Sequence, residues 1–296
     1  PQFLESWYSM LDSLDVVFER MPKYAWIMKQ LLEPERQLSF RVSWIDDDGI
    51  SRVNRGFRVQ YSSALGPYEG GLAFSANANI SGIKAMAFDT TFSNALSGRN
   101  LGGAYGGADL NPFTKSDGEL QRFCQSYMTE LSKYIGPHID YPSAGEGVEN
   151  KEIGYLYGHY KRQRHQFGEL GSGFLWGGNT SNNFNAQGHG VVYYAKAILE
   201  DRGLSLAGKK CLITGSHYVA TSVAAKLVEL GAIPITLSDM SGYVHEPDGF
   251  NERKLSAAIA VKADRGSRLG RYILASTSAK FVDGRDDQHS MFDIPC

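Results

Sequence analysis

The sequence has little of what marks a secreted, membrane or metal-binding protein. It has 3 cysteines, Cys124, Cys211 and Cys296, and they lie far apart without forming a pair. We therefore expect free thiols, a reducing compartment and no disulfide framework. No apolar run approaches the ~18 residues of a membrane-spanning helix. The 7 histidines are scattered without the spacing of metal ligands, so we predict no metal site.

An excess of charge of one sign is also missing. The formal net charge is −2 at pH 7, which argues against a general binder of polyanions. What is present, 42% hydrophobic and 21% charged residues over 296 positions, is typical of a soluble globular protein with two domains. The first residue is Pro1 and not methionine, so we expect that the start was processed or trimmed.

The first half of the chain alternates helical and strand patterns. An Asp-Gly turn at residues 46–49 lies between two β-rich runs and predicts a hairpin of strands 37–45 and 50–60. Ser116 and Glu119 have the spacing of a helix-capping box. The periodicity of apolar residues predicts helices over 3–19, 24–32, 80–96, 116–134 and 152–165.

The second half has the order of strands and helices that is typical of a dinucleotide-binding fold. A strand at 209–214, a glycine turn, a helix at 219–230 and a strand at 233–237 follow one another within about thirty residues. Further helices are predicted at 252–263 and 268–274, with short strands at 280–282 and 292–295. The Gly-, Asn- and Ser-rich stretch 168–188 is predicted to link the two domains.

Two glycine clusters surround the segment that we expect to carry the site. Gly70-Gly71 precede the helix predicted at 80–96, and the run 102–107, which reads GGAYGG, follows it. Glycines this dense indicate a backbone that is brought close to another group, because no Cβ stands in the way. The residues beside them, Glu69 and Tyr105, are therefore the candidate functional residues.

These motifs resemble the hexameric glutamate dehydrogenase family, and the small NADP-type enzymes most. The chain has PYEGG at 67–71, TTFSN at 90–94 and GGAYGG at 102–107, where the family has PYKGG, QTFKN and GGGKGG. The resemblance covers nearly the whole chain, and the family continues for about a third of its length beyond the segment similar to 293–296. It implies an α/β fold with a substrate-type domain containing a mixed sheet (1–180) and an incomplete Rossmann-like domain (181–296).

The resemblance also implies which positions correspond to the family's substrate site. The substrate-binding lysine becomes Glu69, and the neighbouring glutamine becomes Thr90. The following lysine becomes Ser93, the catalytic lysine becomes Tyr105, and the catalytic aspartate becomes Gly145. We expect these positions to be vestigial.

The physical chemistry of the replacements supports that expectation. Glu69 reverses a charge, and two like charges ~4 Å apart repel by about 4 kcal/mol at an effective dielectric of 20. Tyr105 can donate one hydrogen bond but supplies no positive charge near neutral pH. An alternative is that a slipped loop presents Glu146 in place of the lost aspartate.

The nucleotide site departs from the family in the same way. The phosphate-binding turn begins at Gly215 but has His217 in place of its second glycine, which predicts a blocked turn, or alternatively a phosphate contact from the imidazole. Asn183 and Gln187 replace an arginine and a threonine of the family. Asp239 stands where a ribose-binding acid would lie and is equally a turn cap. We therefore expect no cofactor.

Two features of the helix at 152–165 suggest surface contacts. The basic run 161–165 is typical of a solvated face, with an acidic partner or RNA as the alternative. Tyr155, Tyr157 and Tyr160 are expected to be exposed and to contact other chains.

The functional hypothesis from the sequence is a catalytically inactive, glutamate-dehydrogenase-like pseudoenzyme. It would be a structural subunit of a larger assembly, mitochondrial or otherwise cytoplasmic. Its partners would be other protein subunits, with nucleic acid only if that complex contains RNA. The alternatives are a ligand-sensing regulatory module with a remodelled pocket and an NAD(P)-dependent amino-acid dehydrogenase with an altered substrate.

Overall fold

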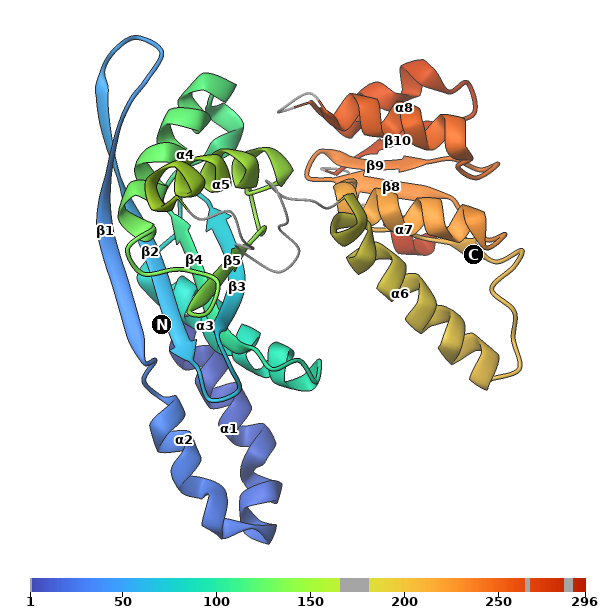
Figure 1. Cartoon of the computed structure of the whole chain (residues 1–296). Helices are drawn as coiled ribbons and strands as arrows, with labels where there is room; N and C mark the ends of the chain where they lie inside the picture. Colours follow the sequence, from blue (N-terminus) through green and yellow to red (C-terminus); the bar gives the residue numbers. More distant parts are fainter. Residues whose placement is uncertain (1, 166–180, 264–266, 285–289) are drawn as a thin grey trace. The chain divides into compact units, whose positions relative to one another are not determined.

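The computed structural model describes residues 2–165, 181–263, 267–284 and 290–296 (Figure 1). The chain divides into two compact units, Pro1–Asn179 and Thr180–Cys296, and each is described by itself. The predicted domain boundary at residue 180 and most of the predicted linker 168–188 lie outside the described residues. The end of that linker was predicted wrongly, because residues 181–188 begin a helix.

The first unit is built on a mixed five-stranded sheet, as expected. The strand order is β1-β2-β4-β3-β5, in which β3 runs parallel to both β4 and β5 and the other pairs are antiparallel. Short 3₁₀ turns span Pro22–Tyr24 and Pro112–Thr114. The strands are β1 (Arg36–Ile45), β2 (Ser51–Ser62), β3 (Tyr68–Phe74), β4 (Gly102–Ala108) and β5 (Asp140–Ser143). The helices are α1 (Gln2–Arg20), α2 (Ala25–Leu31), α3 (Ile80–Leu96), α4 (Asp117–Leu131) and α5 (Asn150–Arg164).

Local sequence signals account for the hairpin and for the start of α4. Gly49 has a φ of +78°, and the Asp46 carboxylate closes the turn by accepting hydrogen bonds from the Asp48 and Ile50 amides. The Ser116 hydroxyl accepts from the Glu119 amide at 3.1 Å, and the Glu119 carboxylate accepts from the Ser116 amide at 3.0 Å. The predicted hairpin and capping box are both confirmed.

The glycine clusters form strands. A Cβ on Gly70 would lie 1.7 Å from the Ala104 carbonyl oxygen, and one on Gly103 would lie 2.0 Å from Thr91 Oγ1. β3 and β4 therefore approach each other and α3 so closely that no side chain fits. Glycine lowers strand propensity, which explains why the sequence pattern did not predict β3 and β4.

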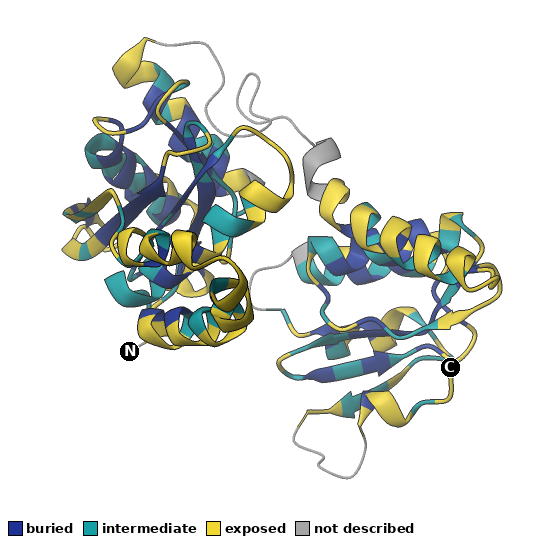
Figure 2. Ribbon diagram, turned by 90° about the horizontal axis from the view of Figure 1, so that it is seen from below, coloured by how far each residue is buried: buried dark blue, intermediate teal, exposed yellow. Residues whose placement is uncertain are grey.

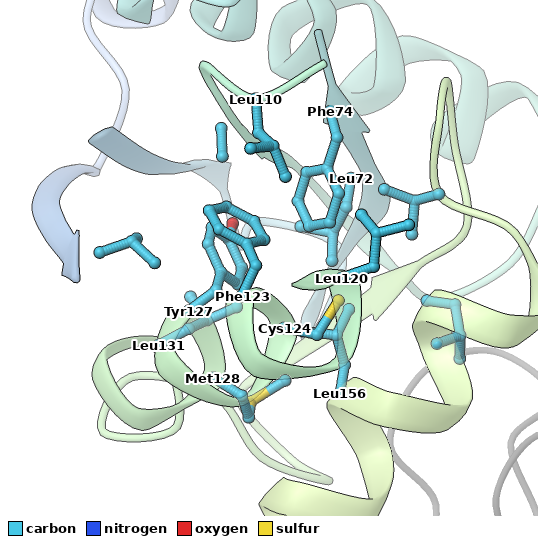
Figure 3. Packing of buried hydrophobic residues seen from close by; sticks show 14 of the residues in the cluster. Leu72, Phe74, Leu110, Leu120, Phe123, Cys124, Tyr127, Met128, Leu131 and Leu156 are labelled. Carbon is cyan, nitrogen blue, oxygen red and sulfur yellow. The ribbon is translucent and has the colours of Figure 1, made fainter. Parts of the chain in front are cut away.

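Helices cover both faces of this sheet. One core joins the strands to α4 and α5, and there Phe74 packs edge-on against Phe123 and Tyr127, with ring centroids 5.2 and 5.5 Å apart (Figure 3). The second core joins the other face to α1 and α3 through residues such as Phe3, Tyr61 and Phe88. The last seven residues of β2 are buried, because both faces are covered there. Figure 2 shows buried residues in dark blue along the strands between the helices.

The expectation of exposed tyrosines on α5 is wrong. Tyr157 and Tyr160 are 4% and 2% exposed, and Tyr155 packs against the core shared with α4. The basic run ends α5, where Arg164 Nε donates to the Ser132 carbonyl at 3.0 Å and His165 closes the helix with a φ of +51°. The predicted alternative of an acidic or RNA partner for this run stays a prediction.

The second unit is Rossmann-like and contains an added antiparallel sheet. Strand β6 (Lys210–Cys211), helix α7 (Tyr218–Glu229) and strand β7 (Ile233–Pro234) form the expected parallel βαβ connection. Strands β8 (Thr236–Asp239), β9 (Gly242–His245) and β10 (Lys280–Asp283) form the antiparallel sheet. The unit also contains α6 (Ser181–Asp201), α8 (Glu252–Ala263) and 3₁₀ turns at Leu269–Ala275 and Met291–Asp293.

Two strand predictions in this unit need correction. The strand predicted at 209–214 is reduced to two paired residues, and the segment at 292–295 contains the end of a 3₁₀ turn and no strand. A short apolar run predicts burial, but pairing depends on where the neighbouring strand ends. Within the described residues, no helix is long and apolar enough to cross a membrane.

Candidate active site

The candidate site lies where α3 ends beside the first residues of β3 and β4. Asn79 starts α3 by accepting hydrogen bonds from the Ser81 and Gly82 amides at 3.1 and 3.0 Å. At the other end of the helix, Asn94 Nδ2 donates to the Gly102 carbonyl at 2.7 Å and to Glu69 Oε2 at 3.1 Å. One amide group therefore ties the helix to both strands and fixes the Glu69 carboxylate.

Tyr105 and Gly145 share one space. A Cβ on Gly71 would lie 3.0 Å from Tyr105 Cε2, and a Cβ on Gly145 would lie 2.8 Å from the Tyr105 hydroxyl. The phenol ring thus passes over Gly71 and ends where a side chain at position 145 would begin. The two substitutions identified in the sequence are coupled, because the larger residue needs the absence of the other side chain.

The loop that contains Gly145 is held in one register. The Phe74 amide donates to the Glu146 carbonyl at 2.8 Å, and Gly145 and Val148 exchange two backbone hydrogen bonds of 3.1 Å. The Glu146 side chain is exposed. These bonds give no support to the alternative in which a slipped loop presents Glu146.

Thr90 and Ser93, although close in sequence, have different surroundings. The Thr90 hydroxyl donates to the Met86 carbonyl at 2.7 Å, and its methyl group lies 3.3 Å from the position of a Cβ on Gly70. Ser93 is exposed and lines a hollow between α1 and α3. Thr90 therefore lies beside the backbone of β3 at Gly70, and Ser93 lies at the hollow between α1 and α3.

A buried ion pair supports β3 from behind, and the sequence interpretation did not find it. Arg58 and Asp140 have side chains that are both 0% exposed, with Arg58 Nη2 2.5 Å from Asp140 Oδ1. Arg58 Nη1 also donates to the Gly70 and Gly71 carbonyls at 3.1 and 3.2 Å. Burial alone lowers the pKa of Arg58, but the Asp140 carboxylate raises it above its usual value. The signal in the sequence that could have revealed this pair was an arginine among the residues of β2 that become buried.

The predicted nucleotide-site residues lie around the start of α7. Gly215 has a φ of +93°, and its amide donates to Ser238 Oγ at 2.8 Å. His217 is the N-cap residue of α7, and its ring lies edge-on to Tyr218 with centroids 5.2 Å apart. Gln187 is exposed on α6, whereas the side chain of Asn183 lies outside the described residues. Whether His217 blocks the turn stays a prediction.

Asp239 closes a turn, one of the two roles that its position suggested. Its Oδ1 accepts from the Ser241 amide at 2.9 Å and the Ser241 hydroxyl at 2.5 Å. Its Oδ2 accepts from the Leu269 amide at 2.8 Å and from Lys262 Nζ at 3.3 Å. Burial alone raises the pKa of Asp239, but these hydrogen bonds lower it below its usual value. Both oxygens are therefore already used within the second unit.

Comparison with known proteins gives the same assignment for both units. Residues 34–162 match the family description Glu/Leu/Phe/Val dehydrogenase, dimerisation domain, and residues 177–296 match Glutamate/Leucine/Phenylalanine/Valine dehydrogenase. An enzyme of Xylanibacter ruminicola named NAD(P)-specific glutamate dehydrogenase is 41% identical over 100% of this chain and 68% of its own length. The chain belongs to the Glu/Leu/Phe/Val dehydrogenase family.

Other members of the Glu/Leu/Phe/Val dehydrogenase family extend the match. The NADP-specific glutamate dehydrogenase of Giardia intestinalis is 43% identical over 96% of this chain. A crystal structure of Plasmodium falciparum glutamate dehydrogenase superposes with a TM-score of 0.89 at 41% identity, covering 95% of this chain and 61% of that one. The chain spans 64% of the Giardia enzyme and 54% of the enzyme from Chlorella sorokiniana.

These matches contradict the hypothesis of a catalytically inactive scaffold. The relatives, 43% and 41% identical, are named as dehydrogenases, so neither a pseudoenzyme nor a structural subunit of a foreign assembly is supported. The hypothesis was wrong because it was based on a few substituted positions and not on the similarity of the whole chain. The predicted family and fold are confirmed.

Proposed function

We propose that the chain forms part of a nicotinamide-nucleotide-dependent amino-acid dehydrogenase, with glutamate as the first substrate to test. The observation that carries the proposal is the 43% identity, over 96% of this chain, to a relative named NADP-specific glutamate dehydrogenase. The reaction converts an amino acid, water and the oxidised nucleotide into a 2-oxo acid, ammonium, a proton and the reduced nucleotide.

We propose that the substrate binds beside Glu69 and Tyr105. A carboxylate stabilises a neighbouring ammonium group, and a phenol hydroxyl donates a hydrogen bond to a carbonyl oxygen. These are the two functional groups that the reaction interconverts. Asn94 Nδ2, 3.1 Å from Glu69 Oε2, would hold the carboxylate in place while the amine is released. The Tyr105 hydroxyl, in the space left by Gly145, would orient the carbonyl and exchange a proton with it.

We propose that the start of α7 binds the phosphates of a dinucleotide. The first N–H groups of a helix have no partner within it, and Gly215 gives the preceding turn the left-handed conformation that such loops use. Lys262, 26% exposed and 3.3 Å from Asp239, neutralises the acid at the end of β8. An acid there favours NAD, whereas a cation favours the 2′-phosphate of NADP. The bound nucleotide would accept the hydride from the substrate carbon.

The test uses the full-length protein with NADPH, ammonium and the 2-oxo acid of glutamate, leucine, phenylalanine or valine, following the loss of NADPH absorbance. We expect turnover with at least one of these acids. Tyr105→Phe should lower kcat by about 10²–10⁴-fold and leave KM nearly unchanged if the hydroxyl exchanges the proton. Absence of turnover with all four acids, in protein that binds NADPH, would refute the proposed function.

We also propose that the first unit packs against another copy of the chain. Its family description names a dimerisation domain, and exposed apolar side chains occur on α1, α2 and the hairpin, including Tyr8, Trp26 and Val53. Light scattering of the full-length protein should give a multiple of the monomer mass, and a monomer at micromolar concentration would refute this. The mitochondrial location stays a prediction, and cell fractionation would test it.

A further inference from the structure

A hollow between α1 and α3 is separate from the residues proposed to bind substrate. The two helices lie side by side (Figure 1), and the space between them measures about 440 Å³. It is lined by Ser6, Ser9, Met10 and Ser13 of α1 and by Phe88, Asp89, Phe92 and Ser93 of α3. Its volume is within the range of about 300–1,000 Å³ of pockets that hold small molecules.

The hollow has an apolar side that is fixed by the core. Phe88 is 2% exposed and packs edge-on against Phe92, with ring centroids 5.1 Å apart. Phe92 and Met10 pack against the same buried cluster as Phe88. Phe92 and Met10, which are partly buried, provide an apolar surface for the carbon skeleton of a ligand, and the buried Phe88 holds Phe92 in place.

The polar side of the hollow carries one sign of charge. Asp89 is the charged residue of the lining, and no lysine or arginine lies among the lining residues. Ser6, Ser9 and Ser13 follow one another at spacings of three and four, so α1 presents their hydroxyls on one face. A carboxylate and hydroxyl oxygens accept hydrogen bonds from an ammonium group, which has three donors. Burial raises the pKa of Asp89, as expected for a carboxyl group beside an apolar wall without a cation.

We propose that this hollow binds a small organic cation, an ammonium group on an apolar body. The ammonium pairs with the Asp89 carboxylate and the serine hydroxyls, and the apolar body lies against Phe92 and Met10. An organic acid is excluded, because its carboxylate would face Asp89 without a compensating cation.

The test measures binding of 2-phenylethylamine to the full chain by calorimetry, with 2-phenylethanol and 3-phenylpropionate as probes that share the aromatic body. The amine should bind at least about tenfold more tightly than the alcohol, since only the amine brings a charge that pairs with the Asp89 carboxylate, and the acid should not bind. Equal affinity of the amine and the alcohol would overturn the proposal.

Variants locate the site. Asp89→Asn keeps the shape of the side chain and should weaken amine binding at least about tenfold, whereas Glu130→Gln on α4 should leave it unchanged. Ser9→Trp fills the hollow and should abolish binding, provided that circular dichroism shows a folded protein. Amine binding that survives both Asp89→Asn and Ser9→Trp would show that the cation binds elsewhere.

Discussion

At the scale of single residues, charge decides what the candidate active site accepts. The Glu69 carboxylate is fixed by Asn94 at 3.1 Å, and Arg58, a cation whose charge interacts with that of Glu69, has a side chain that is 0% exposed. We therefore expect that a substrate approaches Glu69 but does not reach the guanidinium. A second carboxylate on the substrate meets repulsion that this side of the site does not compensate.

Glu69→Lys should raise the KM for glutamate by about tenfold or more, because it replaces the carboxylate proposed to pair with the substrate ammonium by a second cation. Steady-state kinetics of the full-length enzyme measures the effect. Glu130→Lys makes the same charge change at an exposed position of α4 and should leave KM within about twofold. An unchanged KM in Glu69→Lys would mean that the substrate ammonium lies elsewhere.

The buried ion pair gives a second prediction at this scale. Arg58→Met removes the partner of a fully buried Asp140 and should cost about 3–5 kcal/mol of unfolding free energy. Arg55→Met, three residues earlier on β2, breaks an ion pair whose arginine is 74% exposed and should cost less than about 1 kcal/mol. Urea unfolding of both variants measures the difference. Equal losses would show that burial of the pair is not what matters.

At the scale of elements, the cap of α3 holds the helix that carries Thr90 and Asn94. Asn79→Ala removes the acceptor of two amide hydrogen bonds and should cost about 1 kcal/mol. Asn79→Asp keeps an acceptor at the N-cap and serves as the control, which should stay within a few tenths of a kcal/mol of the wild type. Thermal unfolding followed by circular dichroism compares the two variants. A loss of similar size in both would point to packing at position 79 in place of capping.

Glu246, the residue that follows β9, allows a prediction of how the stability of the second unit changes with acid. Four side chains donate to the buried Glu246 carboxylate: Tyr272 at 3.0 Å, Ser276 at 2.7 Å, Lys254 at 2.9 Å and Ser278. Burial alone raises the pKa of Glu246, but these donors lower it below its ordinary value of 4.5. The lowered pKa means that the charged form stabilises the fold above pH 4.5, and that this stability is lost as the pH falls through the folded-state pKa.

The midpoint of thermal unfolding of the second unit should therefore fall as the pH is lowered below 4.5. Glu246→Gln should be less stable near neutral pH and should lose less of its remaining stability on acidification, because the group that titrates is gone. Melting curves of both proteins from neutral to acid pH make the comparison. Parallel curves would assign the acid sensitivity to other carboxylates.

At the scale of the whole molecule, the two units have separate cores. The buried clusters of the first unit contain residues such as Phe74 and Phe88, and that of the second contains Leu237 and Tyr272. We expect two calorimetric transitions, one moved by Arg58→Met and the other by Glu246→Gln. A single transition that both variants shift equally would contradict independent unfolding.

Local patterns predicted much of the fold. The β1–β2 hairpin, α3 and the capping box of α4 each depend on residues that are neighbours in the chain, and all were predicted. Strands β3 and β4 were missed because their glycines serve a close packing that only the folded chain creates. Tyr157 and Tyr160 were expected at the surface because the pattern of α5 gives no sign that α4 covers them.

The sequence by itself determined the family and indicated the residues of the candidate site. The motifs at 67–71, 90–94 and 102–107 are contiguous, so their residues can be recognised without coordinates. Only the tertiary structure decided how these residues meet. It put Tyr105 in the space beside Gly145, attached Glu69 to Asn94, and placed Ser93 at the hollow between α1 and α3. Contacts of this kind join residues that lie far apart in the chain, and they depend on packing distances that no local pattern records.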